Sequence, residues 1–339
     1  MASGKEAALK LEVLVAGGGL AGLATAYALQ AAGHSVRVFE KQPSLGVPAG
    51  GLRVPPNMSK ILKSWAGEEE LHKTAVLCVG TPWHNLDTGE YMGYAEWKPQ
   101  VMQETGGEFL MMKHEDVHRL LYNLATSAGA QVTFGVSVTA VKSGTPKPSV
   151  TLSTGEVLTA DVVIGADGPN SKIRKYINKD EEPAQPSGFT IFGGIVPTSE
   201  MMKDPELAKW AQADEWPIFM GNNRSLCAHP VNGKKEFAFQ AYWPDEDSGP
   251  DPETPGEEAW SDVVPVPTLD YAGIGSNIKR VVDLAPQLVK TKWMKRVEKV
   301  EYWSDETGRI VLVGEAAHPW FVSTLHDHSL TVQWMLTLG

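Results

Sequence analysis

The feature that most constrains the fold of this chain is a glycine-rich turn between two short apolar segments near the N-terminus. Residues 11–16 (LEVLVA) form a β-branched apolar run that suits a buried parallel strand. The run leads into GGGLAG at residues 17–22 and then into a strong helix former that ends at Gly33. A second strand candidate follows at residues 35–41 (SVRVFEK), so the order predicts a β–α–β unit within an α/β fold.

The glycines of this turn have the GxGxxG spacing that suits a dinucleotide. Gly17 permits a tight turn, Gly19 lets a pyrophosphate approach the backbone, and Gly22 lets the helix pack closely on the strand. Leu20 and Ala21 begin the helix, where unpaired N–H groups and a partial positive charge favour a phosphate. The spacing therefore predicts a pyrophosphate-binding loop, with an ordinary glycine-rich turn as the alternative.

An acidic residue at the end of the second strand supports the dinucleotide interpretation. Glu40 follows Gly22 by 18 residues, and its carboxylate can accept hydrogen bonds from the ribose of an adenosine. The adjacent Lys41 is included in the predicted site. An acid at this position suits the free ribose hydroxyls of FAD or NAD and disfavours a 2′-phosphate.

Two later segments also consist of an apolar strand followed by a glycine and an acid. Residues 161–174 read DVVIGADGPNSKIR, and residues 309–319 read RIVLVGEAAHP. The pattern places Asp167 and Glu315 just beyond the C-terminal ends of parallel strands. Open α/β sheets bind their ligands at this edge, so we expect both motifs to lie near the glycine-rich loop.

GGGLAGL, DVVIGADGPNSKIR and VGEAAHP, in this order, resemble the three fingerprints of the single-component FAD-dependent aromatic hydroxylases. That family includes the para-hydroxybenzoate and salicylate hydroxylases. The resemblance extends from about residue 11 to residue 319 and is greatest to fungal salicylate-hydroxylase-like proteins. It implies a Rossmann-like FAD-binding domain with an inserted β-sheet substrate domain, as in para-hydroxybenzoate hydroxylase. The implied FAD-binding domain comprises residues 1–75, 106–182 and 300–339, and the substrate domain residues 76–105 and 183–299.

The resemblance also implies roles for individual residues. The glycine loop and Glu40 would hold the ADP half of FAD. Asp167 and Gly168 would lie by the pyrophosphate and the approach of the nicotinamide cofactor, and Glu315 would hydrogen-bond the ribityl chain. The full implied set of FAD-binding residues is Gly17, Gly19, Leu20, Ala21, Gly22, Glu40, Lys41, Arg53, His114, Arg119, Asp167, Gly168, Gly314, Glu315 and Ala316.

The middle of the chain predicts an antiparallel sheet. Residues 186–197 and 234–243 alternate in the manner of half-buried strands, and residues 76–94 contain a hairpin signal. Such a sheet would cover the flavin and close a mostly apolar pocket. The basic run KTKWMKR, residues 290–296, is interpreted as a solvated face.

The implied activity is that of an FAD-dependent monooxygenase. NAD(P)H would reduce the flavin, and a flavin C4a-hydroperoxide would deliver one oxygen atom from O₂ to a phenolic or related aromatic substrate. A His or Tyr often accepts the phenolic proton in such a reaction. His229 is the first candidate and Tyr242 the second, although a packed histidine before Pro230 is the more common explanation for His229. NADH and NADPH remain alternatives.

Composition limits the possible partners and locations. The chain has 339 residues and a net charge of −11, which argues against nucleic acid as a partner. No segment is long and apolar enough to span a membrane, and the N-terminus does not resemble a signal peptide, so the cytoplasm is expected. Cys78 and Cys227 are interpreted as free thiols, and residues 326–328 (HDH) are a weak metal candidate, so no metal is predicted.

The sequence departs from the family pattern at several positions. His114 replaces a usual Arg, Glu315 replaces a usual Asp, and glycines at residues 193–194 replace an Arg that many members carry. After Pro319 the usual glycine-rich loop and long helix are replaced by a glycine-free segment, which suggests a truncated or altered C-terminus. Two alternatives therefore remain open: an FAD-binding protein with little or no hydroxylase activity, and a simple NAD(P)-dependent oxidoreductase.

Overall fold

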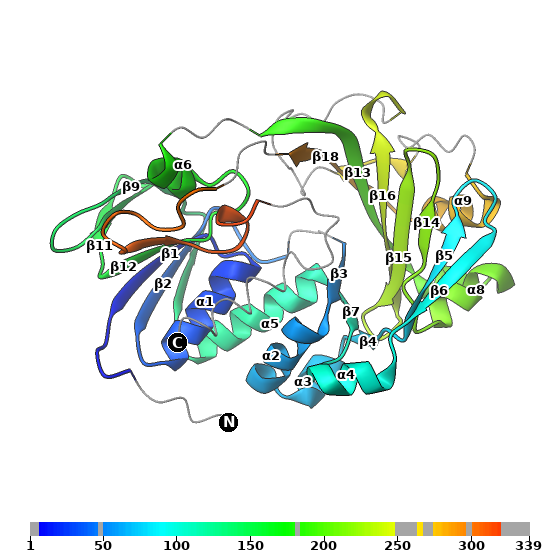
Figure 1. The fold of residues 1–339 in the computed structure, drawn as a ribbon, viewed down its shortest axis with the longest axis horizontal. Helices are drawn as coiled ribbons and strands as arrows, with labels where there is room; N and C mark the ends of the chain where they lie inside the picture. Colours follow the sequence, from blue (N-terminus) through cyan, green and yellow to red (C-terminus); the bar gives the residue numbers. More distant parts are fainter. Residues whose placement is uncertain are drawn as a thin grey trace. The chain divides into compact units, whose positions relative to one another are not determined.

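The computed structural model describes most of the chain as two compact units (Figure 1). The described residues are 7–46, 50–179, 184–247, 263–266, 274–295 and 300–319. One unit comprises Met1–Gly46, Val117–Gln185 and Lys295–Gly339, and the other Val47–Asp116 and Pro186–Met294. The two units describe how the chain packs and not what each part binds. The predicted division into FAD-binding and substrate-binding domains therefore stays a prediction.

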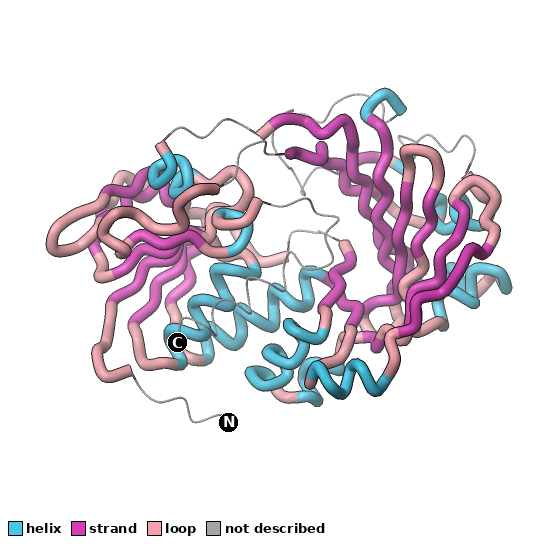
Figure 2. The backbone as a smooth tube through the Cα atoms, viewed as in Figure 1, coloured by secondary structure: helices cyan, strands magenta, loops and turns pink. Residues whose placement is uncertain are grey.

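The first unit is built on a five-stranded parallel sheet with strand order β19-β12-β1-β2-β8 (Figure 2). Its strands are β1 (Glu12–Ala16), β2 (Ser35–Glu40), β8 (Gln131–Phe134), β12 (Val162–Gly165) and β19 (Ile310–Leu312). Helix α1 (Leu20–Ala31) connects β1 to β2, which confirms the predicted β–α–β unit. The second and third motifs follow β12 and β19 directly, so all three motifs come after the C-terminal ends of neighbouring or near-neighbouring parallel strands.

Both faces of the parallel sheet are covered, which explains why its central strand β1 is apolar after Glu12. Val13 and Val15 pack in one core with Ala26 of α1 and Ala125 of α5 (His114–Ser127). Leu14 and Ala16, which alternate with these residues along β1, face a second core. That core includes residues of a three-stranded antiparallel sheet, β9 (Val138–Lys142), β10 (Ser149–Leu152) and β11 (Val157–Thr159), and of α6 (Lys172–Asn178).

The second unit contains an eight-stranded mixed sheet in the order β17-β18-β13-β16-β15-β14-β5-β6. The strands predicted at residues 186–197 and 234–243 are present as β13 (Gln185–Pro197) and β16 (Glu236–Pro244). These two strands pair antiparallel. The predicted hairpin is also confirmed, as β5 (Gly80–Asn85) and β6 (Tyr91–Glu96) at one end of the sheet. The remaining strands are β14 (Ile218–Met220), β15 (Ser225–Val231), β17 (Val263–Val264) and β18 (Leu288–Lys295).

The prediction of a half-buried sheet is wrong at β16, because this strand is buried on both faces. On one face, residues of β16 pack with helices α8 (Pro205–Gln212) and α9 (Ser276–Asp283). The other face of the sheet, which includes Ala238 and His229, is called the second face. A Cβ added at Gly51 would lie 2.8 Å from the Ala238 Cβ and 2.6 Å from the His229 ring. Strand β3 (Gly51–Val54) therefore packs directly against the second face.

The basic run of residues 290–296 is not a solvated face over its described part. Lys290 and Lys292 are only 2% and 5% exposed, since β18 lies inside the sheet. The Lys290 ammonium lies 5.5 Å from the centre of the Phe192 ring, and Lys292 forms a 2.9 Å ion pair with Asp245. The positive charges of the run suggested exposure to solvent. They did not show that side chains distant in sequence could pair with the buried lysines.

The rest of the second unit is a small sheet with short helices. Its strands have the order β3-β7-β4, with β4 (Val76–Leu77) and β7 (Leu110–Lys113). The helices are α2 (Pro56–Ala66), α3 (Glu68–His72), α4 (Pro99–Thr105) and α7 (Thr198–Met201). Cys78 is buried, Cys227 is half-buried, and both are free. Among the described helices, none is long and apolar enough to cross a membrane. The predictions for the tail after residue 319 lie outside the described residues.

Candidate cofactor site

Two glycines of the loop are required by its packing. Gly17 has φ +102°, and a Cβ there would lie 2.2 Å from the carbonyl oxygen of Ala166. A Cβ at Gly22 would lie 1.9 Å from the carbonyl oxygen of Gly17. Real Cβ atoms do not approach backbone oxygens so closely, so these two glycines allow β1, α1 and the end of β12 to come together.

Gly19 is different, because no described part of the chain requires it to be glycine. Its backbone is extended (φ −72°, ψ −173°), it precedes the first residue of α1, and no side chain among the described residues caps the helix. A Cβ added at Gly19 would meet no atom of the described residues within 4 Å. The open space therefore lies at the N-terminus of α1, where free N–H groups favour a phosphate. These features fit the diphosphate of a dinucleotide.

Glu40 is fixed to the loop by its own carboxylate. Its Oε2 accepts a hydrogen bond from the Gly18 N–H at 2.6 Å, and its Oε1 accepts one from the Gln42 N–H at 2.8 Å. A Cβ at Gly18 would lie 2.9 Å from the Glu40 Cβ, so the middle glycine permits this contact. Each carboxylate oxygen keeps a further lone pair, and Glu40 can therefore still accept a ribose hydroxyl.

A histidine that the motifs did not identify also holds the loop. His118 lies on α5, and its Nε2 is 2.6 Å from the carbonyl oxygen of Gly18. A carbonyl oxygen can only accept, so His118 donates this hydrogen bond. Gly18 is thus held on both sides, through its N–H by Glu40 and through its carbonyl by His118. No sequence pattern pointed to His118, because its partner is a backbone carbonyl oxygen distant in sequence.

We expect His118→Ala to weaken FAD binding by about 3–10-fold, because one hydrogen bond that orders the loop contributes on the order of 1 kcal/mol. His118→Gln, which keeps a side-chain donor, should recover part of the affinity. Asn123→Ala, at an exposed position of the same helix, is the matched control. Quenching of flavin fluorescence on titration of the apoprotein measures the affinity. Equal affinity for the His118→Ala variant and the control would contradict this role.

The second motif forms a capped turn. Asp167 Oδ1 accepts from the Ser171 hydroxyl at 2.5 Å, and Oδ2 accepts from the Lys172 N–H at 2.8 Å and the Ile173 N–H at 3.3 Å. Asp167 therefore fixes the start of α6, while Gly168 has φ +77° and open space where a Cβ would stand. The structure gives Asp167 a local role, and its contact with a cofactor stays a prediction.

Arg174 connects the second and third motifs, a role that no sequence pattern indicated. It is 1% exposed, and its Nη1 donates to the carbonyl oxygens of Glu315 and Ala316, each at 3.1 Å. Its Nη2 donates to the carbonyl oxygen of Pro169. A single buried guanidinium therefore joins the turn after β12 to the 3₁₀ turn after β19, Gly314–Ala316. Both turns follow adjacent strands, which brings the predicted residues Asp167 and Glu315 to one edge of the sheet.

The remaining predicted cofactor residues have varied surroundings. Lys41 and Arg119 are exposed, and Gly314 is buried with φ +64°. His114 begins α5, and its N–H donates to the Gly50 carbonyl at 3.0 Å. In the second unit, the Arg53 guanidinium lies 4.8 Å from the centre of the Trp216 ring, and its Nε is buried without a hydrogen-bond partner among the described residues.

His229, the first catalytic candidate, is packed in the second face of the sheet. It is 2% exposed, and its ring lies against the backbone of Gly51. Burial, and then the positive charge of Arg53, lower its pKa to about 3. His229 is therefore neutral at physiological pH and a weak base, which favours the packing interpretation. A role as proton acceptor stays a prediction.

Tyr242, the second candidate, shares the second face with Gln240, and its hydroxyl is 3.3 Å from the Gln240 Oε1. The Tyr242 ring lies 5.4 Å from the Trp293 ring. Gln240 is opposite Gly193, where an added Cβ would approach only the Phe239 carbonyl oxygen, at 4.0 Å. At Gly194 a Cβ would lie 2.4 Å from the Phe239 ring, so a side chain there would collide with the core. The glycine pair thus leaves space beside Gln240 while preserving the core behind it.

A comparison with protein families identifies the family of this chain. A family model described as an FAD binding domain matches residues 10–324, and the chain belongs to this family. The chain is 26% identical to the FAD-dependent monooxygenase OpS4 of Beauveria bassiana over 91% of its own length and 71% of the relative. It is 28% identical to the 3-hydroxybenzoate 6-hydroxylase of Polaromonas naphthalenivorans, over 97% of this chain and 78% of that protein.

A solved structure supports the fold. The structure of CtdE in complex with FAD and a substrate superposes with a TM-score of 0.82 at 18% identity, covering 97% of this chain and 80% of that chain. The predicted fold class, the aromatic-hydroxylase family and the FAD cofactor are therefore confirmed, as is the class of enzyme, an FAD-dependent monooxygenase.

Proposed function

We propose that this chain uses NAD(P)H and O₂ to hydroxylate a phenolic or related aromatic or secondary-metabolite substrate. The observation that carries the proposal is the open backbone at Gly19, at the N-terminus of α1 and beside the fixed carboxylate of Glu40. This arrangement supports binding of the ADP half of FAD at the loop. The names of the relatives, one of them a 3-hydroxybenzoate hydroxylase, support an aromatic substrate.

The chain's own residues would bind and orient the cofactor. The N–H groups at the start of α1 would receive the diphosphate, and Glu40 would accept hydrogen bonds from the adenosine ribose. Asp167, Gly168, Gly314, Glu315 and Ala316 would lie along the rest of the cofactor, in turns that Arg174 joins. Bound and reduced FAD would supply the oxygen chemistry, by activating O₂ for transfer of one oxygen atom to the substrate.

The second face of the eight-stranded sheet would contact the substrate. Gln240 and Tyr242 offer an amide and a phenol among apolar neighbours, and the glycine at 193 leaves room beside them. A surface of this composition would suit a flat ring with one or two polar substituents. We propose Tyr242 as the group that hydrogen-bonds the substrate hydroxyl, because its hydroxyl can exchange the Gln240 partner for a ligand.

The test begins with the bound cofactor. We expect purified protein to be yellow and to release FAD on heating, and to oxidise NADPH or NADH faster when the correct phenol is added. Product analysis by mass spectrometry should find one added oxygen atom from ¹⁸O₂. Stable FAD binding with no product from a broad phenol panel would favour the alternative, an FAD-binding protein with little or no hydroxylase activity.

The class of partner and the location follow from the same proposal. The expected partners are a small aromatic molecule, NAD(P)H and O₂, and neither a membrane nor a nucleic acid is expected. We propose the cytoplasm as the location, where NAD(P)H is available. A simple NAD(P)-dependent oxidoreductase is disfavoured, because such an enzyme has no need for the second and third motifs. Product carrying no oxygen from ¹⁸O₂ would favour that alternative.

A further inference from the structure

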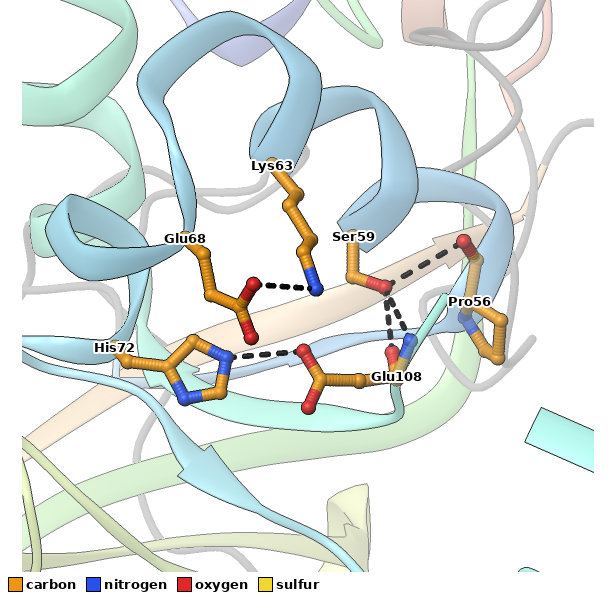
Figure 3. Close-up of polar contacts among 6 residues, drawn as sticks. All are labelled: Pro56, Ser59, Lys63, Glu68, His72 and Glu108. Atoms are coloured by element: carbon orange, nitrogen blue, oxygen red, sulfur yellow. Dashed lines mark hydrogen bonds and ion pairs between the residues drawn. The ribbon is translucent and has the colours of Figure 1, made fainter. Parts of the chain in front are cut away.

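Three side chains that can bind a metal meet on the surface of the second unit, outside the proposed flavin and substrate residues (Figure 3). Glu68 and His72 are the first and last residues of α3, four positions apart, so both project from the same side of one helical turn. Glu108 approaches from the segment that leads into β7. One ligand atom from each residue lies within 4.8 Å of the others.

The chemistry of this cluster selects a particular kind of ion. Two carboxylates and one imidazole are ligands for first-row divalent ions such as Zn²⁺, whereas Mg²⁺ prefers oxygen ligands alone. Ligands about 2.1 Å from a tetrahedral ion are separated by about 3.4 Å. The His72 Nε2 and the Glu108 Oε2 are already 2.9 Å apart. Small rotations of partly exposed side chains are therefore enough to bring Glu68 into the same coordination sphere.

One of the ligands is held in place by a buried residue. The Ser59 hydroxyl donates to the Glu108 carbonyl at 2.6 Å and accepts from the Glu108 N–H at 2.9 Å. Ser59 is buried on α2, so the backbone of Glu108 is fixed relative to that helix. Glu108 also lines a cavity of about 530 Å³ next to the cluster. The cavity leaves room for a water molecule or another small ligand to complete the coordination.

A lysine contacts one of the three side chains. The Lys63 ammonium forms a 2.9 Å ion pair with Glu68, and the Lys63 side chain is 39% exposed. An exposed pair of this kind contributes at most about 1 kcal/mol, so an ion can displace Lys63 into solvent. Lys63 then acts as a competitor whose removal should strengthen binding of an ion. An ordinary surface salt-bridge network would show no such effect.

We propose that Glu68, His72 and Glu108 form a binding site for a first-row divalent transition-metal ion, represented by Zn²⁺. The bound ion would join α3 to the segment before β7 and so fasten two parts of the second unit that are distant in sequence. The role of the bound ion would be structural, and binding of the ion would require neither FAD nor the proposed hydroxylase activity.

Titration of the untagged full-length protein with ZnCl₂, followed by isothermal calorimetry, tests the proposal. We expect one Zn²⁺ per chain in this site, and an affinity at least about 10-fold weaker in His72→Ala and in Glu108→Gln, since even loss of an indirect contact to a ligand costs that much. Lys63→Met should bind about 2–5-fold tighter. Zn²⁺ should raise the unfolding temperature of the wild type and not that of His72→Ala. An excess of MgCl₂ should not compete.

The matched control is the double variant His326→Ala and His328→Ala, which removes the two histidines of the HDH segment named as a weak metal candidate. It should retain the same Zn²⁺ affinity as the wild type. Loss of binding in this control, or unchanged binding in both His72→Ala and Glu108→Gln, would overturn the proposal, as would the absence of saturable binding. Circular dichroism of each variant separates loss of the site from loss of the fold.

Discussion

Gly19→Ala is expected to weaken FAD binding by roughly 10–100-fold while leaving the stability of the apoprotein nearly unchanged. The backbone of Gly19 has dihedral angles that alanine adopts freely, and an added Cβ would meet no atom within 4 Å in the part of the chain that the structure describes. The added methyl group would occupy the space that the diphosphate requires. Overpacking of this kind costs about 1–3 kcal/mol, which corresponds to the stated loss of affinity.

Gly22→Ala is the matched counterpart, because the same change three residues along should act on the fold. Its Cβ would lie 1.9 Å from the Gly17 carbonyl oxygen, so α1 would have to move away from β1. We expect the free energy of unfolding of the apoprotein to fall by about 3 kcal/mol or more, at the upper end of overpacking effects. Urea unfolding of the apoproteins and FAD titration separate the two outcomes. If both variants lost stability equally, Gly19 would have a structural role that its open surroundings do not indicate.

These two glycines also show how far the sequence could predict the site. The GxGxxG spacing identified both positions, because the β–α–β unit is local and its geometry repeats wherever the motif occurs. The order of the three motifs was also sufficient for the fold class, since parallel strands place their C-terminal ends at one edge. The motif also assigned Gly22 to close packing and Gly19 to the approach of a pyrophosphate, and the contact that an added Cβ would make at Gly22 confirms the packing role.

Contacts between distant segments were beyond sequence reasoning. His118 and Arg174 hold the loop and the two turns through backbone carbonyl oxygens, and a carbonyl carries no sequence signal. The lysines of β18 were misjudged for a related reason. Charge suggested solvent, but the position of β18 within the sheet gave Lys292 an ion-pair partner in Asp245. Local patterns therefore predicted the elements, and tertiary pairing decided the environment of the polar residues.

The second large effect is expected on acidification, and it comes from His229. The folded protein holds the pKa of His229 at about 3, because the ring is buried and Arg53 lies near it, whereas the ordinary value is 6.5. Between these two pH values the unfolded chain binds a proton that the folded chain does not. The free energy of unfolding should therefore contain the full contribution of His229 above pH 6.5, and it should decrease as the pH falls toward 3.

The size of this effect follows from the difference in pKa. His229 should contribute a slope of up to about 1.4 kcal/mol per pH unit, or about 5 kcal/mol in total at pH 3. Urea unfolding between pH 7 and pH 4 measures the slope, and His229→Gln, which cannot take up a proton, should lose this component at some cost in stability at pH 7. Carboxylates elsewhere also contribute below pH 5, so the comparison of slopes between pH 6.5 and pH 5 is decisive. An identical slope in the two proteins would mean that His229 accepts a proton in the folded state, and it would return His229 to consideration as a proton acceptor in catalysis.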